Sequence, residues 1–226
     1  MAKQTINIGS TANDGTGSTL RVGGDLINDN FNEIYTAFGD GSTLSNAIPG
    51  KVQGANFTGS ILVGHSTTGA LNNASSNTAL GIGAMDAITS GDQNTIIGYD
   101  AGTALTTAPN NTFVGRAAGQ SVTTGAGGST YMGDAAGFNH IGALNTAVGK
   151  SSMQSALNAN GYENSAFGQQ SLVALSSGLR NTGIGNNSGG AINTGSYNVT
   201  LGYNSGDNIT SGDGNVIIGS INADSA

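Results

Sequence analysis

A short pattern, Asn-Thr-x-apolar-Gly, recurs with small substitutions about every 17 residues along most of this chain. The copies that begin with Asn start at Asn77, Asn94, Asn111, Asn145, Asn164, Asn181, Asn198 and Asn215. Ser60 and Ser129 stand at the two places where the spacing predicts a further copy. A fixed period of this length is typical of solenoids, in which each repeat forms one coil and buries its apolar side chains by stacking on its neighbours.

A glycine stands four residues after the first residue of every copy, and we call it the fixed glycine. These residues are Gly64, Gly81, Gly98, Gly115, Gly133, Gly149, Gly168, Gly185, Gly202 and Gly219. A glycine that recurs at the same position in every copy indicates either a positive φ or the close approach of a neighbouring coil. A small residue follows three positions later in most copies, often before another Gly, as in YDAG at 99–102, which indicates a tight corner.

Apolar residues recur at two places in the repeat. The residue before the fixed glycine is apolar in almost every copy, for example Leu80 and Ile97, and its period-two relation to a β-branched residue predicts that it faces inward. A second aliphatic residue returns seven positions after the fixed glycine in most copies, for example Ile88. We therefore expect strand, turn, strand, turn in each coil. Stacking would also align the Asn, Thr and Gly positions into ladders, with side-chain amides bonded to their equivalents above and below.

The sequence thus predicts an all-β fold, a parallel β-solenoid or β-roll of about ten coils over residues 51–226. Residues 1–50 lack the repeat and form a separate N-terminal segment, because Pro49 and Gly50 mark a boundary. Within it, residues 25–38 are predicted to be a helix whose apolar stripe has the heptad-like spacings 4, 3 and 4. This stripe consists of Ile27, Phe31, Ile34 and Phe38. A helix this short is marginal alone, so the stripe should pack either on the solenoid or, as we prefer, on copies of itself, and three copies would suit a fibre.

Two stretches resemble known phage proteins. The segment IGSTANDGTGSTLRVGGDLINDNFNEIYTAFGDG at 8–41 resembles an N-terminal segment of structural and tail-fibre proteins of contractile-tailed phages, including cyanophages. The Asn-Thr-x-x-Gly-x-x-Ala-Gly units at 60–219 are similar to repeats of phage fibres and of trimeric autotransporter adhesin heads, which are parallel β-rolls in trimers. The resemblance implies a homotrimeric virion fibre that is attached to other virion proteins by its N-terminal segment. The repeat is longer than that of autotransporter heads, so a different handedness and strand count are open. The lack of a signal peptide or membrane anchor speaks against an autotransporter.

Charge and composition argue against several classes of partner. The formal net charge is -7, and the six Lys and Arg residues are scattered, so no basic stripe for nucleic acid is expected. No stretch approaches the roughly 20 apolar residues that span a bilayer, so no membrane insertion is expected. Without cysteine there is no disulfide or thiolate metal site. We expect synthesis in the host cytoplasm and a final place on the tail or capsid surface of a virion.

No residue pattern predicts catalysis, a cofactor or a metal ion. His65 and His140 lie singly in or near predicted turns and are expected to be exposed, and Glu33 and Glu163 belong to different modules, which speaks against a glycosidase pair. The glycines at 81 and 83 belong to the repeat, and no βαβ unit surrounds them. The chain is therefore predicted not to be an enzyme.

The predicted function is that of a tail fibre that positions or provides host-surface attachment. Alternatives are a head-decorating fibre, a connecting tail or baseplate protein and, with less support, a surface-polysaccharide depolymerase. The residue after the fixed glycine varies between copies, as a solvent-facing position would. Two of these residues, Tyr99 and Tyr203, are candidate contacts for a host glycan, although a tyrosine there could equally cover a neighbouring subunit.

Overall fold

The computed structural model describes residues 50–65, 67–125, 127–155 and 159–220. All of them belong to the second of the two units into which the chain divides, Gly50–Ala226. The predicted helix and its stripe of Ile27, Phe31, Ile34 and Phe38 lie outside the described residues, so the helix and the homotrimer remain predictions.

The described residues contain only short strands, joined by turns. The strands are β1 (Gly50–Val52), β2 (Phe57–Thr58), β3 (Ile61–Val63), β4 (Ala74–Ser75), β5 (Thr78–Leu80), β6 (Thr95–Ile97), β7 (Thr112–Val114), β8 (Thr130–Met132), β9 (Thr146–Val148), β10 (Ser165–Phe167), β11 (Thr182–Ile184), β12 (Val199–Leu201) and β13 (Val216–Ile218). No helix occurs in this part of the chain. The predicted all-β fold is confirmed.

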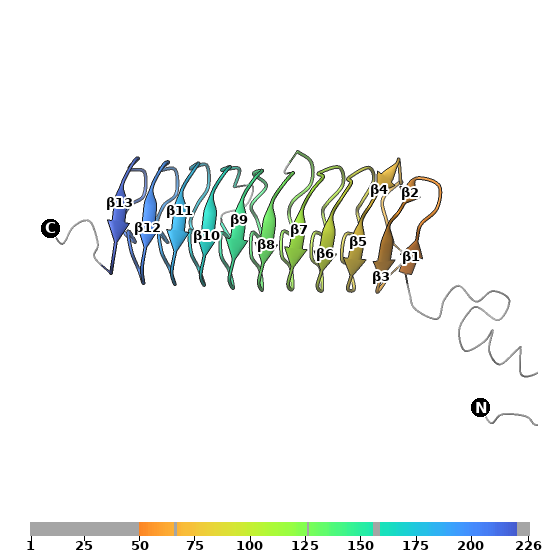
Figure 1. Cartoon of the computed structure of the whole chain (residues 1–226), viewed down its shortest axis with the longest axis horizontal. Helices are drawn as coiled ribbons and strands as arrows, with labels where there is room; N and C mark the ends of the chain where they lie inside the picture. Colours follow the sequence, from red (N-terminus) through yellow and green to blue (C-terminus); the bar gives the residue numbers. More distant parts are fainter. Residues whose placement is uncertain (1–49, 66, 126, 156–158, 221–226) are drawn as a thin grey trace, which may run out of the picture. The chain divides into compact units, whose positions relative to one another are not determined.

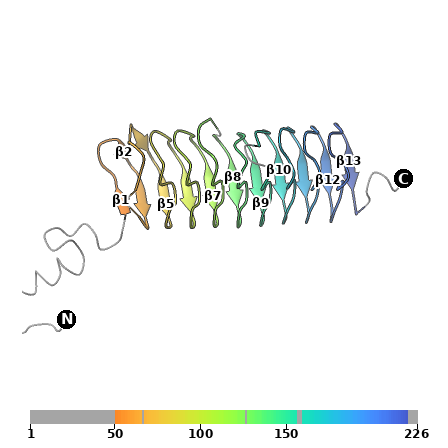
Figure 2. The ribbon, with the colours of Figure 1, turned by 180° about the vertical axis from the view of Figure 1, so that it is seen from behind.

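One long sheet forms a side of the solenoid. From β3 through β5 to β13, each strand pairs in parallel with the next, and equivalent residues of successive repeats are partners, as with Thr78 and Thr95 (Figure 1). β1 pairs antiparallel with β3 at one end, and β2 pairs with β4 in a separate two-stranded sheet. Figure 2 shows the same stack from behind. The 17-residue period therefore sets the strand register, and the predicted parallel β-solenoid is confirmed.

Each coil from β5 to β13 contributes one strand, whereas the repeat predicted two. After the fixed glycine the backbone turns through a residue of positive φ, such as Asp100 (φ 53°) or Ala117 (φ 55°), which is incompatible with an extended strand. The turns still bond from coil to coil, because the Gly102 amide donates to the Ala118 carbonyl at 2.9 Å. The second aliphatic residue is buried without belonging to a strand, as Ile88 and Leu105 show.

The face of each strand that is buried is the opposite of the predicted one. The residue two positions after the Asn anchor is the buried one, for example Ile96 and Phe113, whereas Leu80 is 50% exposed. The physical reason is the anchor itself: Asn77 and its equivalents are buried, and residues two apart in a strand share a face. The inward placement predicted for Leu80, Ile97 and their equivalents is therefore wrong.

The buried asparagines form a hydrogen-bonded ladder through the interior. The Oδ1 atom of Asn77 accepts from both the backbone amide and the side-chain amide of Asn94, each at 3.0 Å. The side-chain amide of Asn94 also donates to the Ala108 carbonyl at 3.1 Å. Where serine replaces asparagine, one bond survives, since Ser129 Oγ accepts from the Asn145 amide at 3.2 Å. The predicted asparagine ladder is present, and each member satisfies the backbone of the next coil.

The fixed glycines satisfy both backbone demands predicted for them. The eight from Gly81 to Gly202 have φ between 130° and 139°, as in Gly168 at 133°. A Cβ atom on Gly168 would lie 2.3 Å from the carbonyl oxygen of Gly185 in the next coil, and Gly115 would meet Gly133 at the same distance. Only glycine fits here, because the backbones of successive coils touch at this corner.

Candidate interaction surfaces

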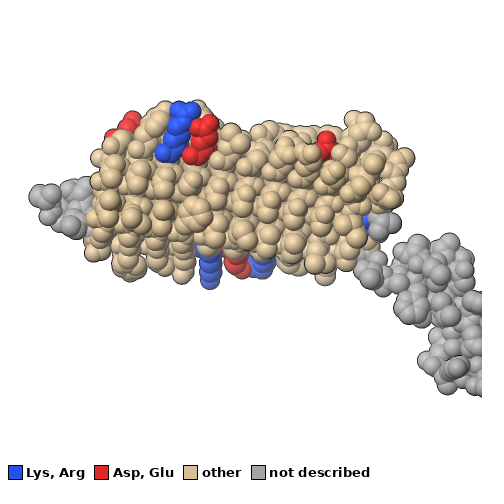
Figure 3. Space-filling model, viewed as in Figure 1, with Lys and Arg blue, Asp and Glu red and all other residues tan. Residues whose placement is uncertain are grey.

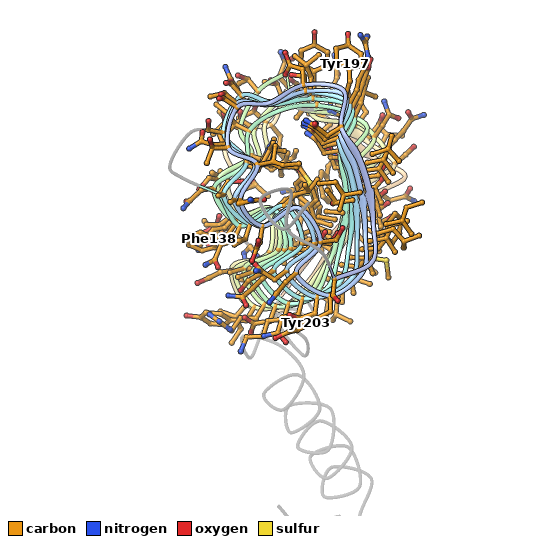
Figure 4. The ribbon with its side chains drawn as sticks, turned by 90° about the vertical axis from the view of Figure 1, so that its left-hand side faces the viewer. Phe138, Tyr197 and Tyr203 are labelled. Atoms are coloured by element: carbon orange, nitrogen blue, oxygen red, sulfur yellow. The ribbon has the colours of Figure 1, made fainter. Side chains whose placement is uncertain are left out.

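The varied residues after the eight fixed glycines from Gly81 to Gly202 form one row along an edge of the sheet, which we call the corner row. It consists of Ile82, Tyr99, Arg116, Asp134, Lys150, Gln169, Asn186 and Tyr203. All are exposed except the half-buried Asp134. Tyr203 projects from this edge in the view along the solenoid (Figure 4). The position is solvent-facing, as its variety predicts.

The two predicted contact residues of the corner row are not close neighbours. Tyr99 is 56% exposed and Tyr203 is 64% exposed, but they follow strands β6 and β12, which are six strand spacings apart. At about 4.8 Å between strands, the two rings are separated by about 29 Å. They do not form one binding site. A ligand that contacts both would have to be long or multivalent.

A charged pair lies in the middle of the corner row. Arg116 Nε and Nη2 donate to the two carboxylate oxygens of Asp134, each at 2.9 Å. These hydrogen bonds hold the pKa of the Asp134 carboxyl below its usual value and raise the pKa of Arg116. The pair lies at the surface in contact with water, so it contributes to the pattern of charge on the surface more than to stability.

A second cluster lies at the opposite edge of the sheet and was not predicted. Arg180 pairs with Glu163 and donates from Nη1 to the Tyr197 hydroxyl at 2.6 Å, and its guanidinium lies 5.5 Å from the centre of the Tyr197 ring. Tyr197 and Tyr203 mark the two opposite edges in Figure 4. The sequence did contain a signal for this cluster. All three residues stand immediately before an Asn anchor at spacings of 17, so stacking of the coils brings them next to one another.

Between these two edges lies an uncharged surface that we call the outer sheet face. It is formed by the residues one and three positions after each anchor in β3 and in β5 to β13. The second of these rows consists of Val63, Leu80, Ile97, Val114, Met132, Val148, Phe167, Ile184, Leu201 and Ile218. None of these strands contains a charged residue. Figure 3 shows the charged side chains along the upper and lower edges of this face and none across its middle.

The two histidines differ from each other. His65 is half-buried, and its Nε2 atom lies 2.9 Å from the Ala84 carbonyl oxygen. His140 is fully buried, so the expectation that it is exposed is wrong. It stands seven residues after Gly133, the slot that Val122 and Leu105 fill in earlier coils. Its Nδ1 atom accepts from the Gly142 amide at 3.3 Å, and its Nε2 atom has no partner among the described residues.

Burial of His140 predicts a pH-dependent stability. Desolvation lowers its pKa from 6.5 to about 4, so the folded chain holds the ring neutral while the unfolded chain protonates it below about pH 6.5. Keeping this ring neutral therefore makes its full contribution to the free energy of unfolding above about pH 6.5. As the pH falls towards 4, that free energy decreases by about 3 kcal/mol. Urea unfolding at pH 7.5 and pH 4.5 should show a smaller loss for His140→Leu than for the unchanged chain. Equal losses would contradict this prediction.

The described residues were also compared with the requirements of a metal site and of a membrane span. No group of three or more His, Asp or Glu side chains in this part of the chain is placed to hold a metal ion. Nor does the described part contain a helix of the length and apolar character needed to cross a membrane.

Comparison with known proteins places the chain among phage proteins. The family model described as "Bacteriophage T4 gp9/10-like protein, N-terminal" matches residues 3–127, which include nearly all of the N-terminal segment and the first coils. The baseplate wedge protein gp10 of Enterobacteria phage T4 is 36% identical over 80 residues, which are 35% of this chain and 13% of that protein. The chain thus matches only a small part of the length of this relative. No solved structure matches the chain.

These matches confirm the resemblance to phage structural proteins. The family match extends across the predicted boundary between the N-terminal segment and the repeats. Because residues 3–127 make up more than half of the 226 residues, the chain belongs to the family of bacteriophage T4 gp9/10-like proteins.

Proposed function

We propose that this chain is a non-catalytic structural component of a phage virion, a tail fibre in which residues 51–226 form a stiff shaft. The observation that carries the proposal is the family match, which joins the N-terminal segment and the first coils in one phage family. The match to a baseplate wedge protein supports a tail location. Residues 1–50 are then the part that binds other virion proteins.

The construction of the solenoid suits a mechanical role. Ten strands, β3 and β5 to β13, stack at about 4.8 Å, which gives a sheet about 43 Å long. Backbone bonds and the asparagine ladder join each coil to the next, so bending the shaft would strain several hydrogen bonds at every coil. Its acidic residues are dispersed, and Glu163 is engaged by Arg180, which supports a structural role over a depolymerase.

The match to a baseplate wedge protein favours one alternative, a connecting protein of the baseplate that never touches the host. Antibodies against residues 51–226, bound to intact virions and viewed by electron microscopy, would test both. Label on projecting tail fibres is the result expected of the proposed function. Label confined to the baseplate would favour the connecting role, label on the head would favour a decorating fibre, and no label on virions would overturn the virion role.

If the shaft touches the host, the corner row is the surface we expect to do so. Exposed tyrosine rings are suitable platforms for sugars, and repeated weak contacts add up in a multivalent fibre. Replacing Tyr99 and Tyr203 together by alanine should slow phage adsorption to host cells several-fold. The matched control replaces Gln169 and Asn186 of the same row by alanine. Equal adsorption by both variants would contradict a role for the tyrosines.

A further inference from the structure

The outer sheet face exposes an unusual amount of apolar surface for a sheet face in contact with water. Leu80, Phe167, Ile184 and Leu201 are 41–50% exposed, and Ile218 is 69% exposed. The other row of the face holds mainly Thr, with Ile61, Val199 and Val216 at the two ends. When one face of a sheet is in water, that face normally carries polar and charged side chains. This face carries no charged side chain on β3 or on any strand from β5 to β13.

The dimensions of the face indicate how strongly it could bind. A length of about 43 Å and a width of about 10 Å for three strand residues give roughly 430 Å². About half of this area belongs to the apolar row, because the other row is mainly Thr. It is the length and continuity of the apolar row along the whole sheet, more than its area, that distinguish this face from scattered exposed apolar residues. Two such faces together would bury roughly 900 Å², somewhat less than the 1,200 Å² or more of a stable specific interface. The face is therefore suited to align subunits that another contact, such as the predicted helix, also holds together.

The periodicity of the face identifies its partner. Its apolar side chains repeat at the strand spacing, about 4.8 Å, over ten strands. A partner with any other spacing would lose register after a few coils, whereas a second copy of this chain has the same spacing throughout. The charged clusters at the two edges, Arg116–Asp134 and Glu163–Arg180, stay outside such a contact and in water.

We infer that the outer sheet face is the surface through which copies of this chain pack on one another, parallel and in register. In parallel, in-register packing each coil lies against the same coil of its partner, as an assembly with its symmetry axis along the solenoid requires. Three copies are expected. The inference stands independently of the location in the virion proposed above, and it assigns a role to the apolar row that the repeat alone predicted to be internal.

Charge placed on the face tests the inference. In the full-length chain, Phe167→Lys combined with Ile184→Lys should weaken self-association at least tenfold, because like charges would face each other in every copy. The matched control, Gln169→Lys with Asn186→Lys, puts the same charges on the corner row of the same coils. Light scattering measures the oligomer, and circular dichroism and urea unfolding verify that both variants fold alike. A monomeric unchanged chain, or equal assembly of the two variants, would overturn the inference.

Cysteine cross-linking tests the orientation, because the chain contains no cysteine. Under oxidation, Ile184→Cys should form disulfide-linked pairs with its own equivalent, whereas Asn186→Cys should not. In an antiparallel contact β11 would instead oppose β6, so a mixture of Ile184→Cys and Ile97→Cys chains would cross-link only between the two variants. That outcome, or absence of any cross-link from residue 184, would overturn parallel packing. Neither experiment involves virions, so it is separate from the labelling test.

Discussion

Replacing Gly168 by alanine is expected to destabilise the solenoid by about 2–6 kcal/mol. The new Cβ atom would lie 2.3 Å from the carbonyl oxygen of Gly185, which belongs to the backbone of the next coil and can move only by disrupting the stack. Overpacking of this kind costs about 1–3 kcal/mol, and a non-glycine residue at φ 133° adds about 1–3 kcal/mol of strain. Urea unfolding followed by circular dichroism would measure the loss.

Two other glycines separate the clash from the backbone strain. A Cβ atom on Gly214 would meet nothing within 4 Å although φ is 70°, so Gly214→Ala should cost only about 1 kcal/mol. Gly54 has neither the clash nor a positive φ, and Gly54→Ala should lie within about 0.5 kcal/mol of the unchanged chain. A loss for Gly168→Ala no greater than that for Gly214→Ala would contradict the close approach of successive coils.

The second large effect is expected from the asparagine ladder. Asn181→Ala should lower the free energy of unfolding by about 3–4 kcal/mol, because it leaves more than one buried polar group without its partner and each such group costs about 1–3 kcal/mol. The Oδ1 atom of Asn181 accepts from the backbone and side-chain amides of Asn198, each at 3.0 Å. Its own amide donates to the Asn164 Oδ1 atom at 3.1 Å and to the Gly195 carbonyl at 2.8 Å. Urea unfolding of the full-length chain would measure the change.

Serine provides the matched comparison for this position. Ser60 Oγ accepts from the Asn77 amide at 2.9 Å, so Asn181→Ser should keep the bond to the Asn198 backbone and cost about half as much as alanine. The exposed Asn186, replaced by alanine, should change stability by less than about 0.5 kcal/mol. A ladder that contributes only solubility would give equal values for all three variants, and that result would contradict the structural role assigned here.

Much of the fold could be predicted from the sequence because the repeat is nearly exact in length. A constant spacing between Asn77, Asn94 and Asn111 leaves parallel in-register stacking as the arrangement that gives each coil the same environment. The positions of the asparagines and fixed glycines were predictable for the same reason, since a residue needed in every coil indicates a demand of the backbone. The interaction surfaces were less predictable. The corner row was visible as variation between repeats, whereas the cluster of Glu163, Arg180 and Tyr197 was missed.

The sequence by itself determined the period, the register, the ladder and the phage-like character of the N-terminal segment. Only the tertiary structure decided which face of each strand is internal, because period-two alternation shows which residues share a face but not which face is buried. The asparagines are buried because they hydrogen-bond to one another inside the solenoid, so the strand residues on the same face as the asparagines are also buried. Leu80 and its equivalents lie on the opposite face and are exposed to solvent. The same applies to His140, which lies in the interior because the stacked coils on either side fix its slot.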